Sequence, residues 1–276
     1  MRTLMTDESQ DLEVELLIEA LFQRFKYDFR NYARSSVARR LQHAMTRFHC
    51  PTISHIQARL LHEPAFLSEL IDVLTVPTTE MFRDPSYFLA LRKNVIPFLK
   101  TFPSLKVWIA GTSTGEEVVS MAILFKEEGL LEKTTIYATD INQRSLDHAA
   151  RGIFDTETIQ KGTHNYREAG GTASMTDYVS VAYGSAKVDP SLLKNVVFSD
   201  HSLATDSVFT EAHLVSCRNV LIYFDRDLQN RATTLFKDSL IRGGFMGLGS
   251  RESLRFLDPA SLFKVFDEHN RLYQKL

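Results

Sequence analysis

The sequence predicts an α/β fold in which a mostly parallel sheet is flanked by helices, preceded by a small all-helical domain and interrupted by a small β element. Three observations support this prediction. From Lys106 onward, short apolar runs alternate with helical segments, which is typical of a parallel sheet with helices on both faces. Residues 11–74 show helical periodicity and almost no strand signal. Residues 152–195 interrupt the alternation with several glycines and the alternating stretch DYVSVAY.

The composition is that of a globular protein without unusual bias. The chain has 276 residues, of which 44% are hydrophobic and 24% charged, and its formal net charge is −2. This balance gives no indication of nucleic-acid binding. The two cysteines, Cys50 and Cys217, lie far apart without metal-ligand spacing, so we expect neither a disulfide framework nor a metal site. No stretch has the pattern of a secretion signal or a membrane span, and we expect a reduced, cytoplasmic protein.

The first 75 residues are expected to form the helical domain, with short helices at 53–61 and 64–74 after a longer one. Apolar residues recur on one helix face at Val37, Leu41, Ala44, Met45 and Phe48. A neighbouring face carries a basic stripe made of Arg39, Arg40, His43 and Arg47. The preceding helix is acidic, so the stripe is a local feature. On its own, such a stripe is consistent with an ordinary solvated helix face.

The second half is expected to contain the strands of the sheet. They are predicted at 106–110, 135–140, 196–200 and 213–217, with helices at 116–128, 143–151 and 225–241. The apolar stretch GFMGLGS (244–250) follows the last of these helices. The chain closes with VFDEHNRLYQKL, which predicts a strand, an Asn turn and a final strand.

The most informative segment is VWIAGTSTGEE, where a strand leads through a glycine-rich turn into a helix with an acidic start. Gly111 and Gly115 allow a tight turn and a close approach of a cofactor to the sheet edge. The turn lacks the lysine followed by Ser or Thr of a phosphate-binding loop. Glu116 and Glu117 would repel a pyrophosphate but suit a sulfonium or an ammonium group. This favours S-adenosylmethionine over NAD, although both glutamates also complement a helix N-terminus.

Asp140 ends the next predicted strand, IYATD, 25 residues after Gly115. A carboxylate in this place can accept hydrogen bonds from both hydroxyls of a ribose. The alternative is an aspartate that caps the following helix. Because the glycine-rich turn and the aspartate occur in the expected order, we predict the ribose contact.

Five motifs in the same order resemble those of the CheR family, which methylates glutamate side chains of chemotaxis receptors. They are TTEMFRDPSYF (78–88), AGTSTGEE (110–117), IYATDIN (136–142), SCRNVLIYFD (216–225) and GGFMGLGSRESL (243–254). YDFRNYARSSVARRL is similar to the family's N-terminal helical domain. The resemblance covers nearly the whole chain and implies a Rossmann-like, class I S-adenosylmethionine-dependent methyltransferase domain with a terminal antiparallel strand in residues 106–276. Residues 76–105 would then be a linker and cofactor-capping segment, and about 152–195 an inserted β-subdomain.

The resemblance also implies residue roles and partners. Arg83 would orient the acceptor carboxylate, and Tyr223 would lie near the reacting centre. The implied cofactor contacts are Thr79, Arg83, Gly111, Glu117 (amino-acid end), Asp140 (ribose), Ser202 and Leu203 (adenine), Arg218 and Asn219. The basic stripe would dock on receptor helices, and the β-subdomain is the part that in some members binds the receptor's C-terminal tail by strand addition. S-adenosylhomocysteine would be the product, and no metal is implied.

The chemistry of such a reaction fits the absence of a nucleophilic triad. A glutamate side chain in water has a pKa of about 4.3 and is therefore already ionised at neutral pH, so the enzyme must mainly align oxygen, methyl carbon and sulfur. Arg83 could hold one carboxylate oxygen and leave the other free; the alternative is a structural ion pair between domains. For Tyr223 the alternative is a core aromatic residue.

Three positions depart from the family pattern: Pro77 replaces a frequent asparagine, Val118 a proline, and Ser202 an asparagine. Two other functions remain open. One is a methyltransferase of a non-chemotaxis signalling receptor, and the other is a non-catalytic module that senses a ligand and docks. Pro77 favours the module, because a proline nitrogen cannot donate a hydrogen bond, whereas Arg83, Asp140 and the Arg218–Asn219 pair favour catalysis. A dehydrogenase is disfavoured by the acidic turn and the terminal hairpin.

Overall fold

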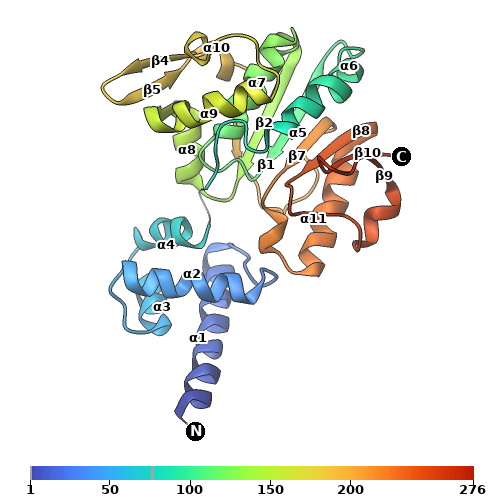
Figure 1. The fold of residues 1–276 in the computed structure, drawn as a ribbon. Coiled ribbons are helices and arrows are strands. Elements are labelled where there is room, and N and C mark those ends of the chain that lie inside the picture. The colour runs from blue at the N-terminus through green and yellow to red at the C-terminus, as the bar shows by residue number, and fades with distance from the viewer. Residues whose placement is uncertain (1, 76–77) are drawn as a thin grey trace. The chain divides into compact units, whose positions relative to one another are not determined.

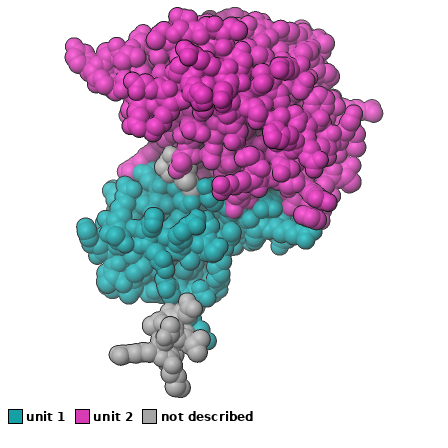
Figure 2. Space-filling view, in the orientation of Figure 1, with its two compact units in different colours: residues 1–76, 202–206, 223–232 teal, residues 77–201, 207–222, 233–276 magenta. Residues whose placement is uncertain are grey.

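The chain forms two compact units (Figure 2). The computed structural model describes residues 2–75 and 78–276, with the backbone alone for residues 2–7. Unit 1 comprises residues 1–76, 202–206 and 223–232, and unit 2 comprises residues 77–201, 207–222 and 233–276. Pro77, the position that departs from the family pattern, lies outside the described residues.

Unit 1 is helical, as predicted. Its helices are α1 (Arg2–Phe25), α2 (Arg34–Arg47), α3 (Ile53–His62) and α4 (Phe66–Leu74) (Figure 1). The apolar face predicted for α2 is confirmed, since Val37, Leu41 and Ala44 are buried. Thr52 begins α3 by accepting a hydrogen bond from the His55 N–H, which satisfies one of the free N–H groups of a helix start.

Unit 1 also contains segments that are distant in sequence. The Ala33 N–H donates to the Tyr223 carbonyl over 2.8 Å, and the Asp225 N–H donates to the Asn31 carbonyl over 2.9 Å. The rings of Tyr32 and Phe224 lie 4.9 Å apart in an edge-on contact. The helical unit is therefore discontinuous, because residues 223–232 are tied to the turn before α2.

Unit 2 is built on a seven-stranded sheet with the order β6-β2-β1-β7-β8-β10-β9. Its strands are β1 (Leu105–Ala110), β2 (Thr134–Asp140), β6 (Val196–Asp200), β7 (Ala212–Cys217), β8 (Leu240–Leu248), β9 (Phe263–Asp267) and β10 (Leu272–Lys275). The first five strands in this order pair in parallel, and β10 is antiparallel to both β8 and β9. The mostly parallel sheet with a terminal antiparallel strand is thus confirmed.

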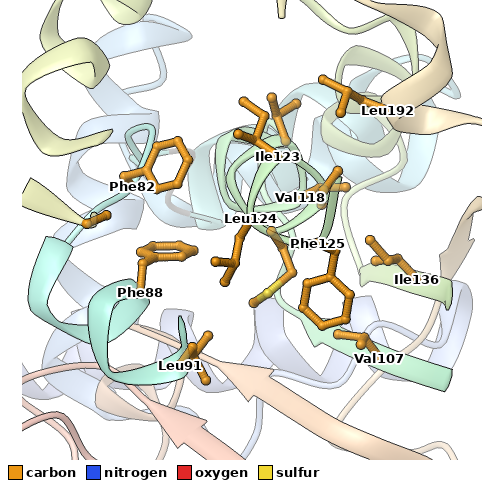
Figure 3. Packing of buried hydrophobic residues seen from close by; sticks show 14 of the residues in the cluster. Phe82, Phe88, Leu91, Val107, Val118, Ile123, Leu124, Phe125, Ile136 and Leu192 are labelled. Carbon is orange, nitrogen blue, oxygen red and sulfur yellow. The ribbon is translucent and has the colours of Figure 1, made fainter. Parts of the chain in front are cut away.

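The helices of unit 2 pack around this sheet. They include α7 (Glu116–Glu127), α8 (Gln143–Arg151) and the part of α11 (Arg226–Ser239) that follows residue 232, near the predicted positions. Short 3-10 turns are η2 (Leu131–Lys133), η4 (Leu221–Tyr223) and η5 (Asp258–Leu262). Figure 3 shows α7 with Phe82, Phe88 and Leu91 on one side and Val107 and Ile136 of the sheet on the other. Burial of these large apolar side chains is the main driving force for the fold.

The segment predicted as a linker, 76–105, contains helical structure. It holds α5 (Pro85–Ala90), the π-helical turn η1 (Leu91–Val95) and α6 (Ile96–Leu99). The π-helical turn comes just before Pro97, which has no N–H to continue the regular hydrogen-bond pattern. Its apolar side chains join the core of unit 2, so this segment is part of the packed domain.

The inserted element forms a separate sheet with the order β3-β5-β4. Its parts are β3 (Ile153–Asp155), α9 (Thr156–Glu168), η3 (Met175–Asp177), β4 (Val179–Ala182), β5 (Ser185–Val188) and α10 (Pro190–Leu193). The sequence did not predict α9, because its polar segment buries only Ile159, Gly162 and Tyr166. Both Tyr166 and Tyr178 donate to the Glu127 carboxylate at the end of α7, which anchors the insertion to the core.

Within the described part of the chain, no helix combines the length and apolarity needed to cross a membrane.

Candidate functional site

Three loops of unit 2 meet at the carboxyl ends of β1, β2 and β7. They are the turn Gly111–Gly115, the end of β2 at Asp140, and the loop that begins at Arg218. The carboxyl ends of parallel strands share one edge of a sheet, where α/β proteins bind their ligands. The first two loops are joined directly, since the Ser113 N–H donates to Asp140 Oδ2 over 2.8 Å.

Asp140 does not cap the following helix. The side chain of Asn142 performs that function by accepting hydrogen bonds from the N–H groups of Arg144 and Ser145 at the start of α8. Asp140 instead accepts from the Ser113 N–H with Oδ2 and from the Asn142 N–H with Oδ1, the latter over 2.9 Å. A carboxylate has about four acceptor positions, so Asp140 keeps capacity for ligand hydroxyls. Burial raises its pKa, against backbone hydrogen bonds that lower it.

The two glycines of the first turn are required by their backbone and by their neighbours. Gly111 has a φ of 79° and Gly115 a φ of 100°, values that side chains rarely tolerate. A Cβ at Gly115 would lie 2.7 Å from Cβ of Ala149 in α8, and one at Gly111 would meet the side chain of Val220. The turn after β1 is thus packed against the helix α8 and against the loop after β7.

Arg218 lies at the centre of an ion-pair network. Its side chain is 1% exposed, and its nitrogens contact the carboxylates of Asp84 over 2.9 Å and Glu117 over 3.1 Å. It also donates to the Arg83 carbonyl over 2.6 Å, and its guanidinium carbon lies 4.3 Å from the ring centre of Tyr87. Arg218 therefore holds the Thr-x-x-Phe-Arg turn (79–83) against the start of α7.

Glu117 is held on both sides. Besides Arg218, its Oε1 accepts from the Ser216 hydroxyl over 2.6 Å, and Ser216 is bonded in turn to the Tyr87 hydroxyl over 2.8 Å. Its neighbour Glu116 is buried and accepts from the Thr114 hydroxyl over 2.7 Å; burial raises the pKa of Glu116. The two glutamates therefore do more than complement the dipole of the helix.

Four non-glycine residues in this region have left-handed backbone conformations. Phe82, Asp84, Ser113 and Asn219 have φ values of 52°, 54°, 52° and 61°. Residues other than glycine seldom adopt this left-handed region, and such strain gathers at functional sites where the surroundings enforce it. The network around Arg218 and the contacts of Asp140 supply that enforcement.

Arg83 is placed differently from Arg218. Its side chain is partly exposed, and its guanidinium donates to the Thr78 carbonyl over 3.2 Å. In the described part of the chain Arg83 forms no ion pair, so nothing there supports a structural ion pair for it. Thr79 lies on the same turn and is also partly exposed.

The remaining predicted site residues belong to unit 1. The Ser202 N–H donates to Asp206 over 2.9 Å, and Leu203 is buried. The Arg40 guanidinium lies 5.1 Å from the ring centre of Tyr223 and donates to the Thr75 carbonyl over 3.3 Å. Arg40 is thus turned inward, whereas the rest of the basic stripe is exposed: Arg39, His43 and Arg47.

Sequence reasoning missed two carboxylates in this region. Asp84 pairs with Arg218, and Glu252 accepts four backbone N–H groups from the loops after β7 and β8. Both lie inside motifs that resemble the family, FRDPSYF and GSRESL. The place of each acid within a motif that resembles the family was the available signal.

The residues present fit S-adenosylmethionine. The region has more negative than positive charge, since its carboxylates are those of Asp84, Glu117 and Asp140 and the ion-pair network contains the one arginine Arg218. An excess of negative charge suits a cofactor that carries a sulfonium and an ammonium group. Two buried polar atoms, Ser113 Oγ and Arg218 Nε, have no hydrogen-bond partner among the described residues. Buried polar atoms are normally satisfied, so a ligand is the simplest source of partners for this turn.

The comparisons with known proteins agree with this geometry. Residues 77–270 match the family model described as CheR methyltransferase, SAM binding domain, and residues 12–75 match the one described as CheR methyltransferase, all-alpha domain. The fold and the two family-model matches together define an S-adenosylmethionine-dependent methyltransferase. The chain belongs to the CheR methyltransferase family, as its motifs predicted.

Three relatives illustrate the similarity. A Pseudomonas putida protein named "Putative methyltransferase Cher3" is 54% identical over 98% of this chain and 100% of its own length. A chemotaxis protein methyltransferase of Listeria monocytogenes is 28% identical over 84% of this chain and 86% of its own. An uncharacterized 104.1 kDa protein of Rhodobacter capsulatus is 30% identical over 94% of this chain, which spans 27% of that protein.

Proposed function

We propose that this protein transfers a methyl group from S-adenosylmethionine to glutamate carboxylates of chemotaxis receptors. The products are glutamate methyl esters and S-adenosylhomocysteine. The observation that carries the proposal is the contrast between two arginines in one turn region. Arg218 forms ion pairs with Asp84 and Glu117, whereas Arg83 has no ion pair in the described chain and is partly exposed. A guanidinium that no carboxylate neutralises, beside an acidic cofactor turn, suits an anionic acceptor.

In this mechanism the residues mainly position the reactants. When bound, S-adenosylmethionine supplies an electrophilic methyl group. Asp140 would accept the ribose hydroxyls with its free acceptor positions, and Glu117 would attract the cationic end of the cofactor. Arg83 would hold one oxygen of the acceptor carboxylate and leave the other free to attack. No general base is needed, because the acceptor glutamate is already ionised at neutral pH.

The Arg83→Ala variant is expected to lower the rate of receptor methylation by about 10- to 100-fold, the effect of losing one charged hydrogen bond in the transition state. The purified protein is incubated with methyl-labelled S-adenosylmethionine and receptor-bearing membranes, and the labelled receptor is then treated with base. Carboxyl methyl esters release methanol in base, whereas methylated nitrogen does not. Arg255→Ala is the matched control, since Arg255 is exposed in unit 2.

The outcomes separate the alternatives. Base-labile label on the receptor, reduced in Arg83→Ala and unchanged in Arg255→Ala, supports glutamate methylation. Base-stable label means that the acceptor is not a carboxylate. Cofactor binding without transfer to chemotaxis receptors points to the ligand-sensing module, or to another signalling receptor if such a receptor is labelled instead.

We further propose that the exposed part of the basic stripe on α2 docks on glutamate-rich receptor helices in the cytoplasm. The double variant Arg39→Glu/Arg47→Glu should raise KM for the receptor about tenfold with little change in kcat, because each exposed charge pair contributes up to about 1 kcal/mol. The double variant Lys93→Glu/Arg255→Glu removes the same charge from exposed positions in unit 2. Equal KM values for both double variants would reject α2 as the docking face.

The β-subdomain is the candidate site for a receptor tail. β4 is an edge strand of the three-stranded sheet, and its Val181 is 58% exposed. An exposed edge strand can accept an added strand from an extended peptide.

A further inference from the structure

Glu252 is a buried carboxylate that binds four backbone N–H groups. The residue is 4% exposed. Its Oε2 accepts from the N–H groups of Gly249 over 2.6 Å and Asn219 over 2.9 Å. Its Oε1 accepts from those of Val220 over 2.9 Å and Ile222 over 3.3 Å. Within the described residues Glu252 has no cationic partner, so these N–H groups are what stabilises its charge.

Only an ionised carboxylate satisfies this arrangement. It offers about four acceptor positions on two oxygens, and each oxygen here receives two N–H groups. A glutamine of the same shape has one acceptor oxygen, and its NH2 group would face two N–H donors. Leaving such buried groups unsatisfied destabilises the loop that they hold. Burial raises the pKa of Glu252, and the backbone hydrogen bonds oppose that effect.

The loop that Glu252 holds carries the central arginine of the site. Asn219 has a φ of 61°, a conformation that needs support from its surroundings. A Cβ at Gly249 would lie 2.8 Å from Asn219 N, Asn219 Nδ2 and Glu252 Oε2, so the three residues are in tight contact. Asn219 directly follows Arg218, whose guanidinium reaches Glu117 and Asp84.

The same loop supports the glycine-rich turn after β1. The N–H of Val220 donates to Glu252 Oε1, and the side chain of Val220 packs where a Cβ of Gly111 would be. A shift of the loop would therefore move both Arg218 and the Gly111–Gly115 turn.

We infer that Glu252 is a positioning residue for the cofactor site: its carboxylate holds the Asn219–Val220 backbone so that Arg218 and the turn at Gly111 keep their cofactor-binding geometry. The inference rests on the cofactor part of the proposed function and is independent of the receptor. No atom of Glu252 has to touch the cofactor for this role.

The test measures the affinity for S-adenosylhomocysteine by titration calorimetry, with thermal melting as a check on folding. We expect Glu252→Gln to weaken binding by about 10-fold or more, and Glu252→Asp to weaken it less. Aspartate keeps the charge but loses packing, whereas glutamine keeps the shape but loses two acceptor contacts. A role in packing alone predicts the opposite order of the two variants and would overturn the inference.

Glu127→Gln is the matched control, because the Glu127 side chain is only 11% exposed and has several donors but lies at the C-terminal end of α7, away from Glu117. It should lower the melting temperature and leave the affinity unchanged. An equal loss of affinity in Glu127→Gln and Glu252→Gln would show that Glu252 acts only by stabilising the fold, and it would overturn the inference.

Gly249→Ala provides a second route if Glu252→Gln does not fold. The φ of Gly249 lies outside the left-handed region, so an added methyl group acts by pushing Asn219 and the Glu252 carboxylate apart. We expect weaker S-adenosylhomocysteine binding, and wild-type affinity would overturn the inference. Since this ligand needs no receptor, failure of the wild-type protein to methylate receptors would reject the proposed function and leave this test intact.

Discussion

The Asp140→Ala variant is expected to bind S-adenosylmethionine at least about 100-fold more weakly than the wild-type protein. Two hydrogen bonds from ribose hydroxyls to a charged acceptor are each worth about 1.5–3 kcal/mol, and every 1.4 kcal/mol corresponds to a tenfold change in affinity. The variant also removes the acceptor of the Ser113 and Asn142 N–H groups, which loosens the turn that the cofactor approaches. Titration calorimetry with the cofactor measures the effect.

The control for this prediction is Asp147→Ala. Asp147 is an exposed acid on α8, where it accepts a hydrogen bond from Gln143 over 2.8 Å. Its removal changes the net charge by the same amount and should leave the affinity unchanged. If Asp140→Ala bound the cofactor within about threefold of the wild type, the ribose contact would be rejected, because one charged hydrogen bond alone exceeds that effect.

The Arg218→Met variant is expected to lower the free energy of unfolding by about 3–5 kcal/mol, the cost of leaving buried charges without their partner. Asp84 and Glu117 would both lose the guanidinium that neutralises them. The fluorescence of Trp108, the one tryptophan of the chain, reports on unit 2 during denaturation. Circular dichroism reports on the helices of the whole chain.

An exposed ion pair provides the comparison. Lys126 and Asp189 lie 3.1 Å apart with side chains 40% and 37% exposed, and Lys126→Met should cost less than about 1 kcal/mol. Arg218→Lys should fall between the two, because an ammonium group cannot span both carboxylates as the planar guanidinium does. A loss below about 1 kcal/mol for Arg218→Met would show that the network does not stabilise the fold.

The sequence predicted the sheet well because its signals are local. The strand before Gly111 and the one ending at Asp140 are short apolar runs bounded by polar residues, and the structure has strands there. The helix α8 was predicted with its observed bounds, Gln143–Arg151. Its start follows from Asn142, a residue type that commonly caps helices.

Other features depend on contacts between distant residues and gave no local signal. The helix α9 is polar along most of its length and is stabilised by the few side chains that it buries, including Tyr166. Its Asn165 amide donates to the Met81 carbonyl over 3.0 Å. Likewise, the two ion-pair partners of Arg218 were not predictable, because Asp84 and Glu117 lie 134 and 101 positions away from it in the sequence.

The sequence proposes which residues form the candidate site, but not how its two arginines are held. Arg83 and Arg218 both stand in motifs that resemble the family, and the resemblance implies a cofactor contact for both and orientation of the acceptor for Arg83. The structure separates them, since one is buried in ion pairs and the other is partly exposed. The sequence could not predict this difference, because the burial of an arginine depends on the assembled fold.

The discontinuous composition of unit 1 limits how this protein can be recombined. The turn before α2 exchanges main-chain hydrogen bonds and a ring contact with residues 223–232, which lie between β7 and β8 in the sequence. A chimera joined at position 76 would pair the helices of one family member with the 223–232 segment of another. The contacts of Tyr32 with Phe224, and of Ala33 with Tyr223, would then be made by residues of different ancestry. Exchange of the helical part between relatives should therefore keep the fold intact only when that segment is exchanged with it.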